Sequence, residues 1–445
     1  MCAVRGVSRT LVAILIIIVV VVAGLGVWYY YSAQKPAVQA TTTTTTTPAT
    51  QVTPTTTTTT TTPVTKYKIA VVYDIGGRGD LSFNDMAYMG AMRAKQELGV
   101  DVREVQSVTE QDYLPNLRTL ASSGEYLVII AVGFLMSSAV DQVAQEYPNQ
   151  LFAIIDAYVN RSNVLSVLFR EHEGSALVGA LAGMVAHYYN CSAVGVVLGM
   201  EIPVLYKFEA GYYWGIRYGE QVYAQQTGQQ VKPLRILYTY TGSFNDPAKG
   251  RTATEAQLAQ GACVVYNVAG ATGLGIIQAA EAAGKAAGKQ YGPPFAIGVD
   301  SDQDWIAPGF VIASMEKRVD VGVFEAVKRA IEYREGRISQ YGGVLELGLS
   351  VRGVDISSVD DLQTFLQIAQ QAGRQVNATD IIQKVQAMRS QMPSWIWDAV
   401  SNLRSQLISN PAGVKVGNLT FAQIEDMVPF DAAKIAQVRQ ALNVG

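Results

Sequence analysis

An acidic residue, a glycine-rich loop and an aromatic–amide pair follow the first apolar segment of the globular chain. The β-branched run from Ile69 to Tyr73 ends in Asp74, and Phe83 and Asn84 come after the glycines. Such a run predicts a buried parallel strand, and open α/β sheets bind ligands beyond the carboxyl ends of their strands. A carboxylate accepts hydrogen bonds from hydroxyls, an aromatic face stacks on a base, and an amide can read the edge of that base. These residues therefore predict a site for a ligand that carries both hydroxyls and a flat ring.

Three more polar residues lie at strand ends further along the chain. Asp156 and Asp300 each end an apolar run, and Lys317 follows the run that should return the chain from a second domain to the first. Each candidate also has an ordinary structural alternative. Strand-end aspartates often only close turns, Asn84 would serve equally well as a helix N-cap, and Lys317 would pair with acidic neighbours at the surface. Phe83 would otherwise be a buried core residue.

Short apolar strands alternate with helical stretches from residue 66 onward, which is the pattern of a parallel α/β sheet. The first series of predicted strands is Ile69–Tyr73, Val102–Gln106, Leu127–Val132, Phe152–Asp156 and Val164–Phe169. The second series is Ala193–Leu198, Ile236–Tyr240, Cys263–Val268, Ala296–Val299 and Val311–Met315. Two such series predict two doubly wound domains. The segments 359–375, 379–392 and 394–409 look helical and form a C-terminal extension.

Composition excludes several classes of function. The 445 residues carry a net charge of -3 with only 16% charged residues, so a basic nucleic-acid-binding surface is not expected. Two histidines and three scattered cysteines predict neither a zinc nor a haem site. No G-x-x-x-x-G-K-[ST] motif occurs, so nucleotide hydrolysis through a P-loop is not expected. We therefore predict no metal and no cofactor.

The N-terminal residues predict a membrane anchor. The segment Leu11 to Trp28 is an unbroken run of 18 apolar or small residues, preceded by Arg5 and Arg9. The positive-inside rule then places residues 1–10 in the cytoplasm, a transmembrane helix over 11–31, and the globular part outside a single-pass membrane protein. Two alternatives stay open: a cleaved secretory signal, or cleavage after Gly6 with the apolar helix retained.

Residues 32–65 predict a tether between this anchor and the globular part. The segment from Thr41 to Thr65 is almost wholly threonine with interspersed prolines. Such a tract cannot bury a core and is typical of an O-glycosylated stalk or a flexible linker.

The globular part resembles the basic membrane protein (BMP) family of ABC-transporter solute-binding lipoproteins, whose best-understood members are purine nucleoside receptors. The segments that carry the resemblance are 68–85, 169–183, 194–203, 208–215, 241–250, 269–275, 298–303 and 314–320. They follow the family order from about Lys66 to about Ser350. Cys2 precedes the apolar run, so it is not placed like a bacterial lipobox cysteine, which is a departure from the bacterial pattern.

The resemblance implies the type I periplasmic-binding-protein fold, in which two doubly wound lobes are joined by a hinge. Lobe one would comprise residues 66–170 and about 318–340, and lobe two residues 171–316 and about 341–355. Residues 356–445 would form the helical extension, whose role the resemblance does not indicate.

The nucleoside receptors of that family hold the base between two aromatic rings and the ribose with carboxylates and a lysine. The ligand-binding residues implied here are Asp74, Phe83, Asn84, Asp156, Phe244, Gly270, Gly273, Asp300 and Lys317. For the second ring, Phe208 and Trp214 are alternatives to Phe244. Gly270 and Gly273 open a turn where backbone amides can approach a ligand, although Ala271 stands where the family has a further glycine.

The implied function is an extracytoplasmic binding protein of an ABC importer, which captures a nucleoside between its lobes and delivers it to permease subunits. A purine nucleoside is expected, and another small solute remains an alternative. A dinucleotide-dependent enzyme on the same architecture is a second alternative, but the chain has no suitably placed histidine base, and a surface tether would separate it from cytoplasmic cofactors. A chemoreceptor ectodomain is a third possibility, but the predicted cytoplasmic segment, residues 1–10, leaves no room for a signalling domain.

Two cysteines are candidates for a disulfide. Cys191 lies just before the first strand of the second domain and Cys263 begins its third strand. In a sheet of order 2-1-3-4-5 these strands are neighbours, and both thiols then lie at the amino end of parallel strands about 4.8 Å apart. One residue of register would turn the thiols apart, in which case both cysteines would be buried apolar residues.

Overall fold

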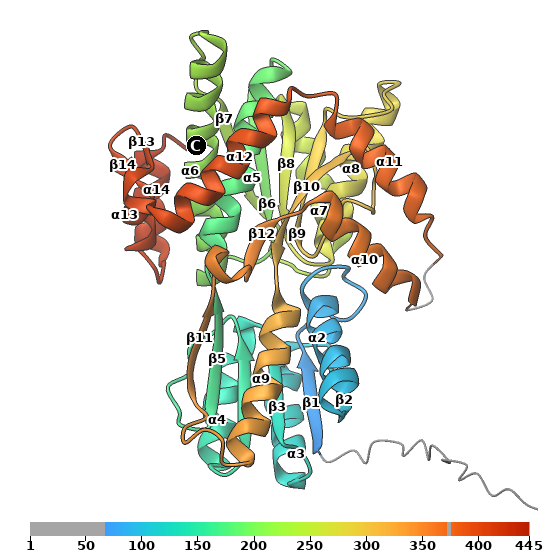
Figure 1. Ribbon diagram of the computed structural model, residues 1–445, viewed down its shortest axis with the longest axis vertical. Coiled ribbons are helices and arrows are strands. Elements are labelled where there is room, and N and C mark those ends of the chain that lie inside the picture. The colour runs from blue at the N-terminus through green and yellow to red at the C-terminus, as the bar shows by residue number, and fades with distance from the viewer. Residues whose placement is uncertain (1–66, 372–374, 445) are drawn as a thin grey trace, which may run out of the picture. The chain divides into compact units, whose positions relative to one another are not determined.

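The computed structural model describes residues 67–371 and 375–444 (Figure 1). The predicted cytoplasmic N-terminus, transmembrane helix and threonine-rich stalk fall on residues 1–65 and lie outside the described residues. Within the two described ranges, no helix has both the length and the apolar character needed to cross a membrane.

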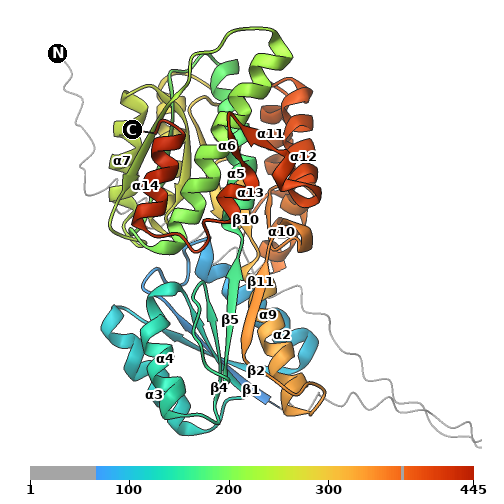
Figure 2. The same ribbon diagram turned by 90° about the vertical axis from the view of Figure 1, so that its left-hand side faces the viewer.

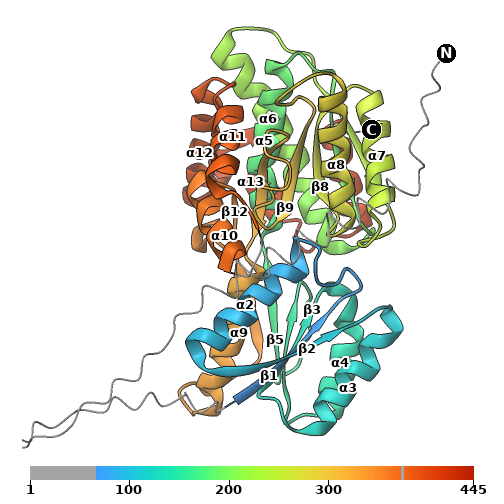
Figure 3. The same cartoon turned by 90° about the vertical axis from the view of Figure 1, so that its right-hand side faces the viewer.

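Lobe one is built on a parallel sheet of six strands in the order β11-β5-β4-β3-β1-β2. The strands are β1 (Tyr67–Tyr73), β2 (Val100–Gln106), β3 (Val128–Val132), β4 (Leu151–Ile155), β5 (Val164–Phe169) and β11 (Gly343–Leu347). Its helices are α2 (Phe83–Leu98), α3 (Tyr113–Ser123), α4 (Ser137–Glu146) and α9 (Val319–Arg334). Helices α2 and α9 cover one face of the sheet, and α3 and α4 cover the other (Figures 2 and 3). The central strands are therefore buried on both faces, as their continuous apolar sequences indicate.

Lobe two has a second six-stranded sheet in the order β12-β10-β9-β8-β6-β7, in which only β12 runs antiparallel to its neighbour. The strands are β6 (Ala193–Leu198), β7 (Arg235–Tyr240), β8 (Ala262–Val268), β9 (Phe295–Asp300), β10 (Val311–Lys317) and β12 (Val354–Ile356). Helices α5 and α6 pack on one face, and α7 and α8 on the other. Their bounds are α5 (Glu171–Tyr188), α6 (Pro203–Thr227), α7 (Pro247–Ala259) and α8 (Thr272–Ala286).

Small residues bring α5 and α6 into close contact. A Cβ added at Gly179 would lie 2.4 Å from the backbone oxygen of Tyr212, and one added at Gly183 would lie 2.5 Å from that of Ile216. Both distances are shorter than real Cβ contacts allow, so larger residues would push the two helices apart.

All ten predicted strands are present, with ends within two residues of the predicted ones. One prediction about the lobe boundaries is wrong. Residues 341–355 were expected in lobe two, but β11 pairs in parallel with β5 in lobe one, and only the short β12 reaches the second sheet. The chain therefore crosses between the lobes three times: after β5, after β10, and between β11 and β12.

The C-terminal extension packs against lobe two, and it contains the predicted helices (Figure 1). Its elements are α10 (Val359–Gln371), α11 (Ala378–Arg389), α12 (Ser394–Ser409), β13 (Lys415–Val416), β14 (Leu419–Thr420), α13 (Phe421–Glu425) and α14 (Ala432–Ala441). Arg439 of α14 forms an ion pair with the buried Glu209 of α6 at 2.8 Å, and Arg217 of α6 donates to the backbone oxygen of Leu442 at 2.8 Å. These charged contacts fix the extension to the outer side of α6.

A disulfide joins Cys191 to Cys263, with the two Cα atoms 6.1 Å apart. The strands β6 and β8 that follow these cysteines are neighbours in the sheet, as predicted. Their pairing is irregular, because β8 has one extra residue between the positions opposite Ala193 and Gly195.

We expect the double substitution Cys191→Ala and Cys263→Ala to lower the free energy of unfolding by about 2–4 kcal/mol, because the bridge closes a loop with a sequence separation of 72. Denaturant unfolding of the two proteins measures this difference. Cys2→Ala is the control and should leave the unfolding midpoint unchanged. An unfolding midpoint of the double variant equal to that of the wild type would contradict the prediction.

Candidate functional site

A cavity lies where the carboxyl ends of the strands in the two sheets meet. Its empty volume is about 580 Å³, which includes the open solvent at its mouth. Eight of the nine predicted ligand-binding residues line it: Asp74, Phe83, Asn84, Asp156, Phe244, Gly270, Asp300 and Lys317. Gly273 does not line the cavity, because it packs closely against Asn267, where an added Cβ would lie 2.1 Å from the side-chain nitrogen. Its amide donates to the Gly270 oxygen at 2.9 Å, so Gly273 shapes the turn that Gly270 presents.

The strands position the charged residues. Asp300 and Lys317 are the last residues of β9 and β10, while Asp74 and Asp156 directly follow β1 and β4. Asp156 and Asp300 have φ angles of 73° and 65°, in the left-handed region that residues other than glycine seldom adopt. Such strained conformations gather at functional sites, where the surrounding structure holds them in place.

Lys317 is the centre of a buried charge network. Its Nζ lies 2.6 Å from Asp156 Oδ2 and 3.1 Å from Glu171 Oε1, and the residue is 1% exposed. The alternative interpretation, in which Lys317 pairs with acidic neighbours at the surface, is therefore wrong. Burial lowers the pKa of Lys317, but the carboxylates of Asp156, Glu171 and Asp300 outweigh this effect, so the pKa is raised and the ammonium stays charged.

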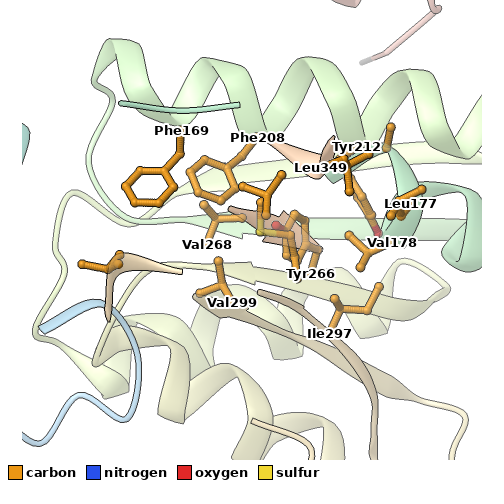
Figure 4. Close-up of a cluster of buried hydrophobic side chains, with 14 of the residues drawn as sticks. Phe169, Leu177, Val178, Phe208, Tyr212, Tyr266, Val268, Ile297, Val299 and Leu349 are labelled. Carbon is orange, nitrogen blue, oxygen red and sulfur yellow. The ribbon is translucent and has the colours of Figure 1, made fainter. Parts of the chain in front are cut away.

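Aromatic rings surround the ammonium group. The Nζ of Lys317 lies 5.1 Å from the ring centres of Phe83 and Phe169 and 5.4 Å from that of Phe208. Phe169 and Phe208 lie side by side at one end of a buried apolar cluster (Figure 4). These rings attract the cation and exclude water from it, which strengthens its attraction to the carboxylates.

The sequence reasoning missed two members of this network, Glu171 and Lys207. Glu171, the first residue of α5, is completely buried, and Lys207 of α6 forms an ion pair with its Oε2. The Lys207 ammonium also donates to the Phe169 oxygen at 2.8 Å. Glu171 follows the end of β5 by two residues, so the strand-end position that identified Asp74 and Asp156 could have identified it as well.

A second group of polar side chains surrounds the start of α2. The Asn84 amide donates to Asp74 Oδ1 at 2.9 Å and to Asp80 Oδ2 at 3.1 Å. Because both amide hydrogens point to carboxylates, Asn84 Oδ1 is the atom left over, and it is buried with no hydrogen-bond partner among the described residues. Burial raises the pKa of Asp74 to about 6 and that of Asp80 to about 7.

Asn84 is not the N-cap of this helix, so that alternative is wrong. Asp80 takes the capping role, since its carboxylate accepts from the backbone amides of Ser82, Asn84 and Asp85 at 2.9–3.1 Å. Asn84 is thereby free to present its side chain to the cavity that it lines.

Asp300 joins the two lobes beside the cavity. Ser82 Oγ of lobe one donates to Asp300 Oδ2 at 2.8 Å and lies 3.1 Å from the Val299 oxygen. Next to it, the Leu81 oxygen accepts from Ser301 Oγ at 2.6 Å and from Gln303 Nε2 at 3.0 Å. Burial raises the pKa of Asp300 to about 6, although the ammonium of the neighbouring lysine lowers it in part.

Two aromatic side chains enter the cavity from different lobes. Phe83 begins α2 of lobe one, and Phe244 precedes α7 of lobe two. Gly199 makes room for Phe244, because an added Cβ there would lie 2.2 Å from the Cε1 of the ring. Phe208 also lines the cavity, whereas Trp214 is buried elsewhere and donates to the Leu419 oxygen of the extension at 3.2 Å. The alternative assignment of Trp214 as a stacking ring is therefore wrong.

Most of the lining residues are apolar, and acceptor groups dominate the polar part of the lining. Four carboxylates, those of Asp74, Asp80, Asp156 and Asp300, face a single lysine among the lining residues, and that lysine is already neutralised by buried acids. Such a surface favours ligands that donate hydrogen bonds and disfavours anions. The described lining residues also include no histidine, cysteine or serine that could act as a nucleophile or base.

Comparisons with known proteins agree with this geometry. The family model Bmp, described as ABC transporter substrate-binding protein PnrA-like, matches residues 66–391, which extends the resemblance beyond residue 350 into α11. An uncharacterized lipoprotein of Pyrococcus furiosus is 40% identical over 348 residues, covering 77% of this chain and 83% of that protein. The ABC transporter nucleoside-binding protein BmpA of Lactococcus lactis is 28% identical over 307 residues, covering 66% of this chain and 82% of that protein.

A solved structure shows the same fold. The solute-binding protein of an ABC transporter system from Aeropyrum pernix K1 has a TM-score of 0.73 and 35% sequence identity, and the match covers 85% of this chain and 97% of that chain.

We expect Lys317→Met to lower the free energy of unfolding by about 3–5 kcal/mol, because it leaves Asp156 buried without its counter-charge. Lys207→Met is the matched control: Glu171 keeps its contact with Lys317, so the loss should be smaller. Denaturant unfolding of the three proteins measures both changes. Equal destabilisation by the two substitutions would show that Lys317 is not the centre of the network.

Proposed function

The chain belongs to the Bmp family of PnrA-like substrate-binding proteins of ABC transporters, and we propose that its ligand is a purine nucleoside. As a member of this family it is a solute-binding protein and not an enzyme. The proposed ligand and the role of each lining residue rest on the chemistry of the cavity.

One observation carries this proposal: aromatic rings from both lobes and carboxylates at the strand ends line the same cavity. Phe83 and Phe244 offer two faces for a base, and Asp156 and Asp300 offer acceptors for ribose hydroxyls. Asp156 Oδ1 supports this role, since it is buried without a hydrogen-bond partner among the described residues. A ligand hydroxyl would supply the missing donor.

The amide side of the cavity suits the base edge. Asn84 Oδ1 is an unpaired acceptor next to the carboxylate of Asp74. Flipping the amide would place its oxygen against two carboxylates, so the acceptor orientation is the favoured one. Amino groups and ring N–H groups of a base fit such acceptors, and adenine, guanine and hypoxanthine all carry at least one. The acceptor edge therefore suits purines in general.

We further propose that the protein works outside the membrane and delivers its ligand to permease subunits. Curated relatives such as the Pyrococcus furiosus protein are named lipoproteins, which fits attachment to the outer face of the cell membrane. A ligand contacted by both lobes would stabilise the closed form, and closure is what a permease can distinguish.

Isothermal titration calorimetry of the purified chain tests the ligand. We expect guanosine, adenosine or inosine to bind more tightly than free bases or hexoses, because only nucleosides occupy both the aromatic and the carboxylate parts. The 5′-monophosphates should bind at least about tenfold more weakly, since a phosphate would meet the acidic lining.

Two variants locate this binding. Phe83→Ala should cost about 1–3 kcal/mol of binding free energy, the range for base stacking on an aromatic ring. Phe365→Ala, in α10 and outside the cavity, is the matched control and should bind like the wild type. Nucleoside affinities no better than that for glucose would refute the proposed function.

Nucleoside affinity should fall as the pH is lowered through about 6. Burial raises the pKa of Asp74 and of Asp300 to about 6, and in the proposed complex a base N–H group donates to Asp74 and a ribose hydroxyl donates to Asp300, each in its ionised form. Protonation removes that acceptor, so binding is stronger above this pH and weaker below it. Calorimetry between about pH 5 and pH 8 measures the trend.

The variant Asp300→Asn tests whether the carboxylate of Asp300 causes part of this pH dependence. Asparagine tolerates the positive φ of 65° at this position, so the substitution removes the charge without forcing the backbone to change. It should weaken the binding of ribosides by about 1.5–3 kcal/mol more than the binding of free bases, and the affinity should depend less steeply on pH. Equal losses for riboside and free base would reject contact between Asp300 and the ribose.

A further inference from the structure

His172 is buried with both of its ring nitrogens unpaired. It is the second residue of α5 and 1% exposed, and neither Nδ1 nor Nε2 has a hydrogen-bond partner among the described residues. Its ring stacks on Phe421 of the extension with centres 5.8 Å apart. A neutral imidazole carries one donor and one acceptor, so burying both without partners is unfavourable. A bound ion or an ordered water is one explanation for such a group.

Two carboxylates lie next to this imidazole. One ligand atom each of His172, Glu173 and Glu425 can be chosen so that all three lie within 4.8 Å of one another. Glu173 is the next residue of α5, whereas Glu425 is the last residue of α13. The three residues therefore connect two parts of the chain. His172 and Glu173 belong to α5, the helix that follows the first lobe crossing, and Glu425 belongs to the C-terminal extension.

The charges around this group leave room for a cation. Arg170 contacts Glu173 Oε1 at 2.6 Å, Glu346 Oε2 at 3.6 Å, and Glu425 Oε1. Three carboxylates thus share one guanidinium, and their combined negative charge is not neutralised by it. Glu173 Oε2 also accepts from the Leu349 amide at 2.7 Å, and the hydrogen bond that Glu425 accepts from Arg170 falls on its Oε1. The guanidinium contacts are compatible with metal binding, because ligating carboxylates are commonly held by outer hydrogen bonds.

We propose that His172, Glu173 and Glu425 bind one divalent transition-metal ion, with Zn²⁺ the best match to one imidazole and two carboxylates. Three protein ligands leave a fourth tetrahedral position for water. The ion fastens α13 to the first turn of α5, so metal binding and docking of the extension reinforce one another. This proposal is independent of the nucleoside ligand.

Calorimetry with ZnCl₂ or CoCl₂, on full-length protein stripped of metal by a chelator, tests the site. We expect one equivalent of either ion to bind, a visible absorption band from bound Co²⁺, and a thermal midpoint that rises with metal concentration. Glu425→Gln keeps the shape of the side chain, and His172→Phe keeps the stacking on Phe421. Each should weaken binding at least about tenfold.

Glu346→Gln is the matched control, because Glu346 also contacts Arg170 but is not one of the three ligands. It should bind metal with affinity close to that of the wild type. The proposal is overturned if stripped wild-type protein binds neither ion saturably, or if both ligand variants bind as tightly as the wild type. It is also overturned if Glu346→Gln loses as much affinity as Glu425→Gln, since the attraction would then be a diffuse charge effect. If His172→Phe does not fold, the comparison of Glu425→Gln with Glu346→Gln decides.

Discussion

The buried ammonium of Lys317 is the interaction on which the rest of the site depends. A lysine loses its hydration when it is buried this completely, and only nearby carboxylates compensate for that loss. Asp156 follows a strand of lobe one, Glu171 begins the first helix of lobe two, and Lys317 ends the strand that leads back. The same ion pairs therefore neutralise the cavity wall and fix two of the three lobe crossings relative to each other. Once the lysine is neutralised, the remaining carboxylate oxygens are left as acceptors toward the cavity.

Much of this arrangement could be predicted from the sequence because it follows from strand ends. Apolar runs located ten strands, and the polar residue after a run located Asp74, Asp156 and Asp300, since parallel strands end at one edge of a sheet. The failures have physical reasons. Strand β11 is a short, largely exposed edge strand without a continuous apolar run. Its pairing with β5 could therefore not be predicted from its own sequence. Helix-borne Lys207 carries no strand-end signal, and its contact with Glu171 depends on how α5 and α6 pack.

The packing of the C-terminal extension was also not predictable from the sequence. Its amphipathic helices were predictable, but the surface they cover was not, because the contacts are single charged residues far apart in sequence. Arg439 meets Glu209, and Glu425 meets Arg170, across more than 200 residues in each case. Counting histidines and cysteines also argued against any metal site. That count overlooked glutamates, which become candidate ligands only when folding brings them to His172.

The three crossings between the lobes have a mechanical consequence. Two bodies joined by a single segment can bend, twist and slide, because one flexible connection restrains few of their relative movements. Here three separate segments link the lobes, and a twist that relaxed one of them would strain another. Bending about the line of the crossings is the movement that all three can share. An opening movement of the lobes would thereby have nearly one degree of freedom, and the Leu81 and Ser82 contacts between the lobes would break together along it rather than one after another.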